Sequence, residues 1–291
     1  MRQLLQAWRR RWWRPDPAAL AAFASLKPMT VVTGGSEGIG FELARRFAAA
    51  GNDVMLVARH AETLEQAAAQ IRAEFKVEAV ILPLDVTTPD AVANIEAALA
   101  AHGTYADVLV NSAGIGLSGP FHAHPPDDVL RLIDLNVRAL SHLTRHFLPG
   151  MRVRGRGGIL NVASLGGYAP GPNQAAYYAS KAYVLSLTEA IAAETAGEGV
   201  RVCALAPGPV NTKFHARMGA ENALYRSFVP PASSQSVARA GYRGFVLGLR
   251  VTIPGLVNPF LALAMRIMPH RIVIPIVGLL LKPREGERRD A

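Results

Sequence analysis

A tyrosine and a lysine four residues apart form the most chemically suggestive pair in the chain. They lie in residues 173–181, which run Asn-Gln-Ala-Ala-Tyr-Tyr-Ala-Ser-Lys. If this stretch is helical, Tyr177 and Lys181 share one face and can reach a common ligand. A phenol ordinarily ionises near pH ~10, but a neighbouring ammonium favours the phenolate, so we expect Lys181 to lower the pKa of Tyr177. The pair could then move a proton near neutral pH.

A serine upstream could act on the same ligand. Ser164 follows the apolar run 159–163, which is typical of a buried strand. A hydroxyl at that strand end, aimed at the same helix, can hydrogen-bond a substrate carbonyl. Tyr-x-x-x-Lys pairs also arise by chance on solvated helices, so this interpretation depends on the rest of the chain.

Length and composition indicate one large α/β domain. The chain has 291 residues, of which 50% are hydrophobic and 18% are charged. This is enough for a well-filled core, and it is short for two full domains. The apolar, Ala- and Gly-rich composition suits a buried parallel sheet and argues against general disorder.

The cysteines and histidines of the chain argue against an internal disulfide and against a metal site. Cys203 is the single cysteine of the chain, so no internal disulfide can form and a reducing, cytoplasmic compartment is expected. Its apolar surroundings predict a small buried side chain. No His/Cys cluster has metal-site spacing, so we predict no metal.

The net charge of +9 is concentrated at the two ends of the chain. The terminal cations are Arg2, Arg9, Arg10, Arg11, Arg14, Lys282, Arg284, Arg288 and Arg289. No nucleic-acid-binding module with interleaved aromatics is present, so we expect no nucleic-acid partner. The charge suits an anionic lipid surface or a phosphate-bearing cofactor.

Residues 1–27 form a basic N-terminal arm. Drawn as a helix, Leu4, Leu5, Trp8 and Trp12 share one arc, with arginines over most of the remainder. Such a helix can lie in a lipid interface, although a short arm that packs on its own domain explains the pattern equally well. No secretory signal is indicated.

A glycine-rich turn follows the first predicted strand. Residues 29–33 are a β-branched run, residues 34–40 read Gly-Gly-Ser-Glu-Gly-Ile-Gly, and a helical pattern over 41–50 stops at Gly51. Glycines let the backbone approach a pyrophosphate closely, and the helix N-terminus supplies N–H groups and a positive dipole end. Strand, turn and helix in this order predict a dinucleotide-binding unit.

The alternation of strands and helices then continues through most of the chain. The predicted strands are 53–58, 77–82, 108–110, 158–163, 200–205 and 250–253, and the predicted helices are 62–74, 90–101, 127–148, 173–196 and 236–249. This order predicts an α/β fold of the Rossmann type, with a doubly wound parallel sheet in three α/β/α layers. Asp85, Asn111, Ser164 and Thr212 each follow a strand, so they should meet at the carboxyl edge, where such sheets bind ligands.

The C-terminal third departs from this pattern. We assign residues 28–253 to the catalytic domain and interpret 213–232 as a flap over the site, or alternatively as an ordinary surface loop. Residues 254–291 form an apolar helical C-terminal extension with a charged tail. Its charge-free run, 251–265, is shorter than the ~18–20 residues that a spanning helix needs. The extension therefore covers a hydrophobic pocket or lies on a membrane surface, and a terminal helix pair packed on the domain fits both.

Residues 29–212 resemble the short-chain dehydrogenases/reductases in their one-domain form. The cofactor loop of that family matches Thr33-Gly34-x-x-x-Gly38-Ile39-Gly40, and residues 111–114, Asn-Ser-Ala-Gly, are similar to its Asn-Asn-Ala-Gly motif. The positions that match its four catalytic residues are Asn136, Ser164, Tyr177 and Lys181. The segment Pro207-Gly208, followed by Val210 and Thr212, looks like the one that holds the nicotinamide carboxamide.

The resemblance implies a role for each of these four residues. Tyr177 donates a proton to the carbonyl oxygen in reduction or removes one from the alcohol in oxidation. Lys181 lowers the pKa of the tyrosine and binds the nicotinamide ribose, and Ser164 polarises the substrate oxygen. Asn136 helps support a water through which Lys181 exchanges protons. The implied cofactor-binding positions are Gly34, Ser36, Gly38, Ile39, Gly40, Arg59, Asp85, Val86, Asn111, Ala113, Gly114, Tyr177, Lys181, Pro207, Gly208, Val210 and Thr212.

The second strand favours NADP(H) over NAD(H). It ends in Arg59 with no carboxylate in place, and an arginine there can pair with a ribose 2′-phosphate. Ser36 supports this choice. Glu37 is a departure, because NADP-preferring relatives often carry a basic residue there. Asp85 and Val86 are expected near the adenine.

The apolar C-terminal stretch resembles that of relatives acting on 3-oxoacyl groups or steroids, some of them membrane-associated. We therefore expect a bulky hydrophobic ketone or secondary alcohol, with Leu165, Tyr168 and Phe214 as pocket walls. The alternatives are a catalytically silent dinucleotide-binding sensor and a membrane-peripheral scaffold held by both termini. Family resemblance implies a homodimer or homotetramer through helices 127–148 and 173–196.

Overall fold

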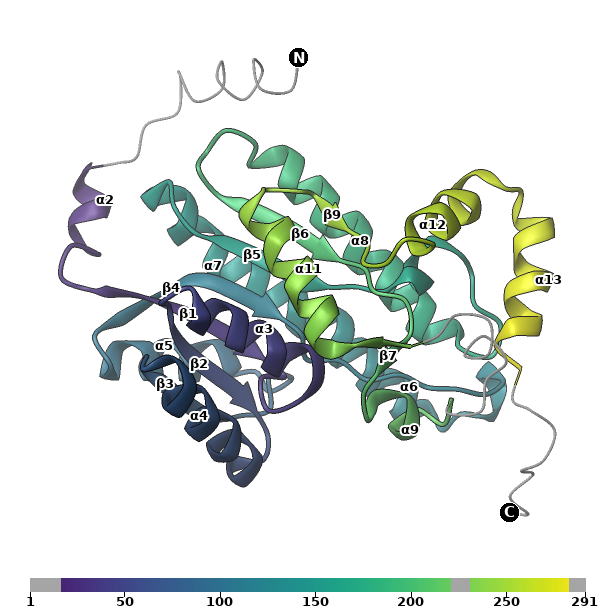
Figure 1. Ribbon diagram of the computed structural model, residues 1–291, viewed down its shortest axis with the longest axis horizontal. Coiled ribbons are helices and arrows are strands. Elements are labelled where there is room, and N and C mark those ends of the chain that lie inside the picture. The colour runs from purple at the N-terminus through teal and green to yellow at the C-terminus, as the bar shows by residue number, and fades with distance from the viewer. Residues whose placement is uncertain (1–16, 221–230, 283–291) are drawn as a thin grey trace.

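The computed structural model describes residues 17–220 and 231–282 (Figure 1). Most of the predicted basic arm, the middle of the predicted flap and the end of the charged tail lie outside these residues. The part of the arm that is described packs on the domain. The Phe23 and Tyr105 rings meet edge to face, with centroids 5.4 Å apart, and the Arg154 guanidinium lies over both rings.

A seven-stranded sheet forms the centre of the molecule, with strand order β3-β2-β1-β4-β5-β6-β9 and every pair parallel. The strands are β1 (Lys27–Thr33), β2 (Asp53–Ala58), β3 (Ala79–Pro83), β4 (Thr104–Asn111), β5 (Gly158–Val162), β6 (Arg201–Leu205) and β9 (Val251–Thr252). A separate pair joins β7 (Val210–Asn211) to β8 (Ala232–Ser233). The chain order reverses between β1 and β4, which places a ligand-binding crevice at their carboxyl ends.

Helices cover both faces of this sheet. They are α2 (Pro17–Ala21), α3 (Gly38–Ala49), α4 (Ala61–Phe75), α5 (Ala91–Ala101), α6 (Pro126–Ile133), α7 (Leu140–Arg154), α8 (Ala175–Glu194), α9 (Phe214–Arg217), α11 (Ser234–Val246), α12 (Asn258–Ile267) and α13 (His270–Leu280), with short η1 (Phe121–Ala123), η2 (Asp134–Ala139) and η3 (Leu165–Tyr168) segments. The predicted fold class, a Rossmann-type α/β/α sandwich, is confirmed.

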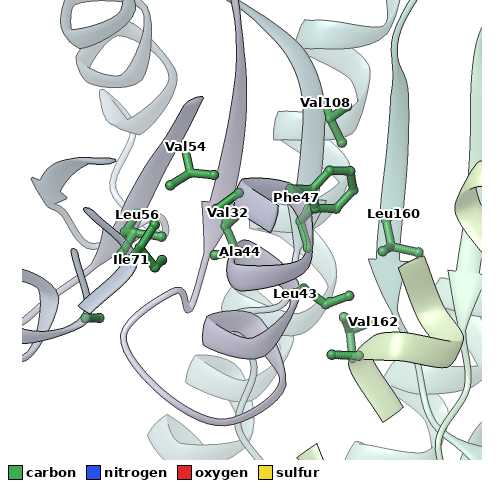
Figure 2. Packing of buried hydrophobic residues seen from close by; sticks show 14 of the residues in the cluster. Val32, Leu43, Ala44, Phe47, Val54, Leu56, Ile71, Val108, Leu160 and Val162 are labelled. Carbon is green, nitrogen blue, oxygen red and sulfur yellow. The ribbon is translucent and has the colours of Figure 1, made fainter. Parts of the chain in front are cut away.

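Alternating strand residues build two cores because successive side chains of a strand point to opposite faces. Val32, Leu56 and Leu160 pack with Leu43 and Phe47 of α3 in a core that also includes α4 and α11 (Figure 2). Their sequence neighbours Val31, Met55 and Ile159 belong to the opposite core, which α5 and α7 cover.

The predicted helix 127–148 differs most from the observed structure. It is helical from Pro126 to Arg154, but η2 in its middle is a π-helical turn. The side-chain amide of Asn136 in this turn forms hydrogen bonds with the backbone N–H and carbonyl oxygen of Ile115 on a neighbouring loop. Periodicity alone predicts a regular helix, because this contact partner is distant in the sequence. Single π-helical turns of this kind often mark functional positions.

Other predicted boundaries shift by a few residues. The strand predicted at 77–82 begins at Ala79, because Lys76 adopts a left-handed conformation at the end of α4. Helix α3 begins at Gly38 inside the glycine turn, earlier than predicted. Strand β4 begins earlier too, at Thr104.

The apolar C-terminal stretch folds into α12 and α13, beside the carboxyl end of the sheet (Figure 1). Val273, Val277 and Leu281 are buried against Ala169 and the Tyr178 ring. Within residues 17–220 and 231–282, no helix has both the length and the apolar character needed to cross a membrane.

Candidate active site

A cleft of about 1040 Å³ lies at the carboxyl ends of the strands. The loops after β1 to β6 contribute to it, as do α8, α9, α12 and α13. The glycine turn lies in the same cleft as Tyr177 and Lys181. A cleft of this size can hold a dinucleotide together with part of a substrate.

The backbone of the glycine turn packs too tightly for side chains. A Cβ on Gly34 would lie 2.9 Å from the Ala113 nitrogen, and one on Gly40 would collide with the Gly34 carbonyl oxygen. Gly34 and Gly38 also have positive φ angles of 66° and 60°, which glycine adopts at little cost. The Glu37 side chain makes no capping hydrogen bond at the start of α3. This N-terminus therefore keeps its N–H groups available for a phosphate.

Arg59 and Asp85 lie at the ends of β2 and β3. Arg59 is exposed in the cleft and makes no ion pair with any other described residue. Burial acts to raise the pKa of Asp85, but hydrogen bonds from the Thr87 hydroxyl and N–H, together with the nearby charge of Arg59, leave that pKa below its usual value. The site therefore has an ionised carboxylate and an accessible guanidinium, both of which suit an adenosine ribose.

Asn111 lies beneath the cleft and does not line it. Its Nδ2 donates to Asn161 Oδ1 at 2.9 Å and to Thr144 Oγ1 at 3.1 Å. Beside it, the backbone N–H groups of Ser112 and Ala113 both donate to Thr33 Oγ1 at 3.2 Å. Asn111 thus ties β4 to β5 and α7, whereas Thr33 fixes the loop that carries Ala113 and Gly114.

Asn136 also lies behind the surface of the cleft, and 1% of it is exposed. Its Nδ2 donates to the Ile115 carbonyl oxygen at 2.8 Å and to Ser180 Oγ at 3.1 Å, and its Oδ1 accepts from the Ile115 N–H at 3.0 Å. A Cβ placed on Gly114 would be 3.2 Å from Asn136 Oδ1 and 3.6 Å from Lys181 Nζ. Asn136 therefore fixes the loop that lies directly against the lysine.

Tyr177, Ser164 and Lys181 meet on the floor of the cleft. Ser164 lies close enough to Tyr177 to lower the pKa of its phenol, and Ser164 Oγ accepts from the Gly166 N–H at 3.1 Å. Lys181 Nζ lies 5.8 Å from the centre of the Tyr177 ring and donates to the Val162 carbonyl oxygen at 2.8 Å. Helix α8 supplies the tyrosine and lysine, and the end of β5 supplies the serine, as their sequence spacing predicts.

The expected lowering of the tyrosine pKa is wrong for this structure. Burial raises the pKa of Tyr177 to about 12, and the nearby Ser164 opposes this only in part. Burial also lowers the pKa of Lys181 to about 8. Desolvation disfavours the charged form of each group, and it is the largest cause of both shifts. The protein therefore presents a protonated phenol beside an amine that can lose its proton at mildly alkaline pH.

Residues 207–214 close another side of the cleft. The Pro207 carbonyl oxygen accepts a hydrogen bond from the Leu165 N–H at 2.8 Å. A Cβ placed on Gly38 would lie 3.4 Å from the Thr212 side chain. The Phe214 ring centroid is 5.5 Å from that of Tyr177. An apolar surface therefore lies directly beside the phenol.

Most of the predicted site residues line this one cleft. They are Gly34, Ser36, Gly38, Ile39, Gly40, Arg59, Asp85, Val86, Ala113, Gly114, Ser164, Tyr177, Lys181, Pro207, Gly208, Val210 and Thr212. Asn111 and Asn136 lie behind it. Of the expected pocket walls, Leu165 and Phe214 line the cleft, whereas Tyr168 is not among the lining residues and packs with Val184 and Leu185.

Sequence reasoning missed several lining residues. Gln174 and Tyr178 flank the tyrosine of the motif, and α12 and α13 supply an apolar wall that includes Leu261, Met265, Met268, Val273 and Val277. The hydrophobicity of residues 254–282 was the available signal, but it does not reveal which of these side chains face inward. Among the described residues, no three His, Cys, Asp or Glu side chains are grouped to hold a metal ion.

Comparison with known proteins identifies the family. Residues 28–223 match the family model described as short chain dehydrogenase. The chain belongs to the short chain dehydrogenase family. The resemblance drawn from the motifs is thereby confirmed, and so is the assignment to a group of oxidoreductases that bind a nicotinamide dinucleotide.

Individual members of the family align over different lengths. The very-long-chain 3-oxoacyl-CoA reductase of Bos taurus is 36% identical over 188 residues, which are 63% of this chain and 60% of that relative. The matched segment thus spans less than two thirds of the bovine protein.

Two solved structures are similar over more of their length. A short-chain dehydrogenase from Sphingobium yanoikuyae, solved in complex with NADPH, has a TM-score of 0.73 and 31% identity over 91% of this chain and 99% of that one. The bulky-bulky ketone specific alcohol dehydrogenase of Comamonas testosteroni has a TM-score of 0.68 and 29% identity over 79% of this chain and 86% of that one.

Proposed function

We propose that this dehydrogenase interconverts a hydrophobic ketone and the corresponding secondary alcohol, using NADP(H). The observation that carries the proposal is that Tyr177, Ser164 and Lys181 line the same cleft as the glycine turn. A bound nicotinamide would supply or accept the hydride. The residues of the chain hold the substrate oxygen and move the proton.

Tyr177 acts as the general acid in reduction. Because its pKa is about 12, it holds its proton at neutral pH and donates it to the oxygen that gains negative charge. Ser164 donates a hydrogen bond to the same oxygen and so stabilises the developing charge. The phenolate that remains lies near the Lys181 ammonium, which lowers the free energy of forming the phenolate. In oxidation the same groups work in the opposite direction.

Lys181 also binds the nicotinamide ribose and returns the proton to Tyr177. Its Nζ and Asn136 Oδ1 flank Gly114, so a water held between them would connect the lysine to solvent. Asn136 is then a positioning residue, because it acts through the Ile115 backbone and this water.

The preference for NADP(H) rests on Arg59 and Ser36. Arg59 is exposed at the end of β2, has no ion-pair partner among the described residues and lies close enough to Asp85 to influence its pKa. A 2′-phosphate would give this guanidinium a partner. The NADPH complex of the Sphingobium relative supports the same choice.

The substrate class follows from the apolar wall that α9, α12 and α13 contribute. Phe214, Met265 and Val277 all line the cleft, and none of them offers a hydrogen bond from its side chain. Such a wall favours a bulky apolar group on the ketone. The name of the Comamonas relative, which specifies bulky ketones, and that of the bovine reductase, which specifies very long acyl chains, are consistent with this class.

Assembly and compartment are part of the same proposal. We place the subunit contact of a homodimer or homotetramer on α7 and α8, where Tyr183 is 40% exposed and bonded to Ser141 at 2.9 Å. A reducing, cytoplasmic compartment is favoured by the single cysteine, Cys203, which is buried in β6.

The test measures the oxidation of NADPH in the presence of a panel of bulky ketones. The loss of NADPH absorbance reports the rate. We expect Tyr177→Phe to lower kcat by about 100-fold or more while NADPH still binds. Tyr242→Phe is the control, because it removes a tyrosine hydroxyl from α11, outside both the cleft and the proposed subunit contact. Cofactor binding without turnover of any ketone or alcohol by the unaltered protein would favour the silent sensor instead.

A further inference from the structure

The outward sides of α12 and α13 expose a continuous set of large apolar side chains. We define the α12–α13 outer face as Leu256, Val257, Phe260, Leu263, Ile267, Ile272 and Leu279, of which Leu256 is 90% exposed, Phe260 74% and Ile267 71%. Spacings of three and four residues place Phe260, Leu263 and Ile267 on one side of α12, and Leu256 and Val257 directly precede that helix. A soluble monomer rarely leaves such a patch uncovered.

The opposite sides of these helices are already occupied. Ala262, Val273 and Val277 are buried, and Leu261 and Met265 line the cleft. The helices therefore cannot turn to bury the outer face without giving up the wall of the cleft. Figure 1 shows both helices at one end of the molecule, beyond the carboxyl end of the seven-stranded sheet.

The charged side chains of residues 251–282 have one sign. Residues 251–282 contain no Asp or Glu, while Arg266, Arg271 and Lys282 are exposed. None of these three cations forms an ion pair with another residue in the described part of the chain. Apolar side chains bordered by unpaired cations are the features with which peripheral proteins bind anionic lipid.

We infer that the α12–α13 outer face docks on the surface of an anionic lipid bilayer. The apolar side chains enter the boundary between headgroups and acyl chains, and the three cations pair with lipid phosphates and carboxylates. A second copy of the chain fits this face less well. A symmetric contact would bring the cations of both copies together with no carboxylate from residues 251–282 between them.

The single buried cysteine allows a site-specific test in the full-length protein. Cys203 is 1% exposed, so an introduced surface cysteine can be labelled selectively with the polarity-sensitive dye NBD. We expect the dye on Ile267→Cys to shift its emission to the blue with vesicles of phosphatidylcholine and phosphatidylserine. The shift should be much smaller with phosphatidylcholine alone. The dye on Leu130→Cys, a similarly exposed apolar position on α6, should not respond.

Flotation with the same vesicles supplies the second measurement. The triple variant Phe260→Ser, Leu263→Ser, Ile267→Ser should partition at least about 10-fold less, whereas Phe121→Ser, Leu130→Ser should match the unaltered protein. Replacing Arg266, Arg271 and Lys282 by Gln should remove the preference for phosphatidylserine. None of these side chains lines the cleft, so turnover in solution should persist.

Several outcomes would overturn the inference. Flotation of the protein with no change in the emission of the dye at position 267 would show that another segment binds the lipid. Equal shifts at positions 130 and 267 would indicate unspecific adsorption. Absence of flotation, together with a smaller particle mass for the triple serine variant, would assign the face to a second copy.

Discussion

Glu37 and Arg217 form an ion pair that joins the glycine turn to α9, although 180 residues separate them in the sequence. Lys213 Nζ lies 3.9 Å from the same carboxylate. The departure of Glu37 from the basic residue expected in NADP-preferring proteins therefore has a structural role here. The acidic side chain holds α9, and with it Phe214, beside the cofactor loop.

Breaking this pair should affect cofactor release more than stability. Both side chains are partly exposed, so we expect Arg217→Gln to lower the free energy of unfolding by less than about 1 kcal/mol. NADPH should dissociate several-fold faster, because α9 is released and a cation is lost, and stopped-flow fluorescence can measure this rate. Arg152→Gln breaks an exposed pair with Glu198 outside the cleft and should leave the rate unchanged. Equal effects of the two variants would contradict the role assigned to Glu37 and Arg217.

Arg59→Ala should change the choice of cofactor. Loss of the guanidinium removes the proposed partner of the 2′-phosphate, so the Kd for NADPH should rise by about 10-fold or more while that for NADH changes little. Calorimetric titration of both cofactors measures the two constants. Lys27→Ala removes an exposed lysine at the opposite end of the sheet and serves as the control. If NADH and NADPH lost affinity equally, Arg59 would be structural and not selective.

The buried lysine should make the unliganded protein more stable at mildly alkaline pH. The pKa of Lys181 is about 8 in the folded protein against an ordinary 10.5, so above pH 8 the unfolded chain binds more protons. Stability due to this group therefore rises between pH 8 and 10.5, by at most about 3 kcal/mol. Tyr177 contributes in the opposite direction only above pH 10, because its pKa is raised from 10 to about 12.

Urea unfolding of the unaltered protein and Lys181→Met at pH 7, 8 and 9 tests this linkage. The difference in unfolding free energy between the two proteins should shrink as the pH rises, with Lys181→Met the more stable at pH 7. Comparing the two removes the contribution of Cys203, whose pKa burial raises to about 12 in both. A difference independent of pH would show that Lys181 titrates normally in the folded state.

Gly40→Ala should damage the cofactor loop without unfolding the sheet. Its Cβ would collide with the Gly34 carbonyl oxygen, so we expect NADPH affinity to fall by about 10-fold or more. Gly51→Ala is a useful comparison, because Gly51 has a φ of 83° but nothing lies within 4 Å of its Cβ position. That variant should lose only about 1 kcal/mol of stability, measured by urea unfolding, and bind NADPH normally. Normal NADPH binding by Gly40→Ala would contradict the tight packing of the turn.

The sequence alone determined the order of the elements and the place of the chemistry. Apolar runs bounded by glycine and proline predicted the strands, because strand-forming patterns are local. The glycine turn was recognisable because close backbone approach excludes side chains at Gly34 and Gly40. Tyr177 and Lys181 are one helical turn apart in any helix, and Ser164 follows a strand, so their convergence on one edge required only a parallel sheet.

The tertiary structure decided what depends on distant partners. The π-helical turn around Asn136 follows from contacts with Ile115, and the pairing of Glu37 with Arg217 joins segments that share no local pattern. The pKa of Tyr177 is raised although the sequence led us to expect a lowered one, because desolvation is set by everything packed around a group and not by its nearest charge. Hydrophobicity marked residues 254–282 as unusual, but only packing separated the side that lines the cleft from the side left exposed.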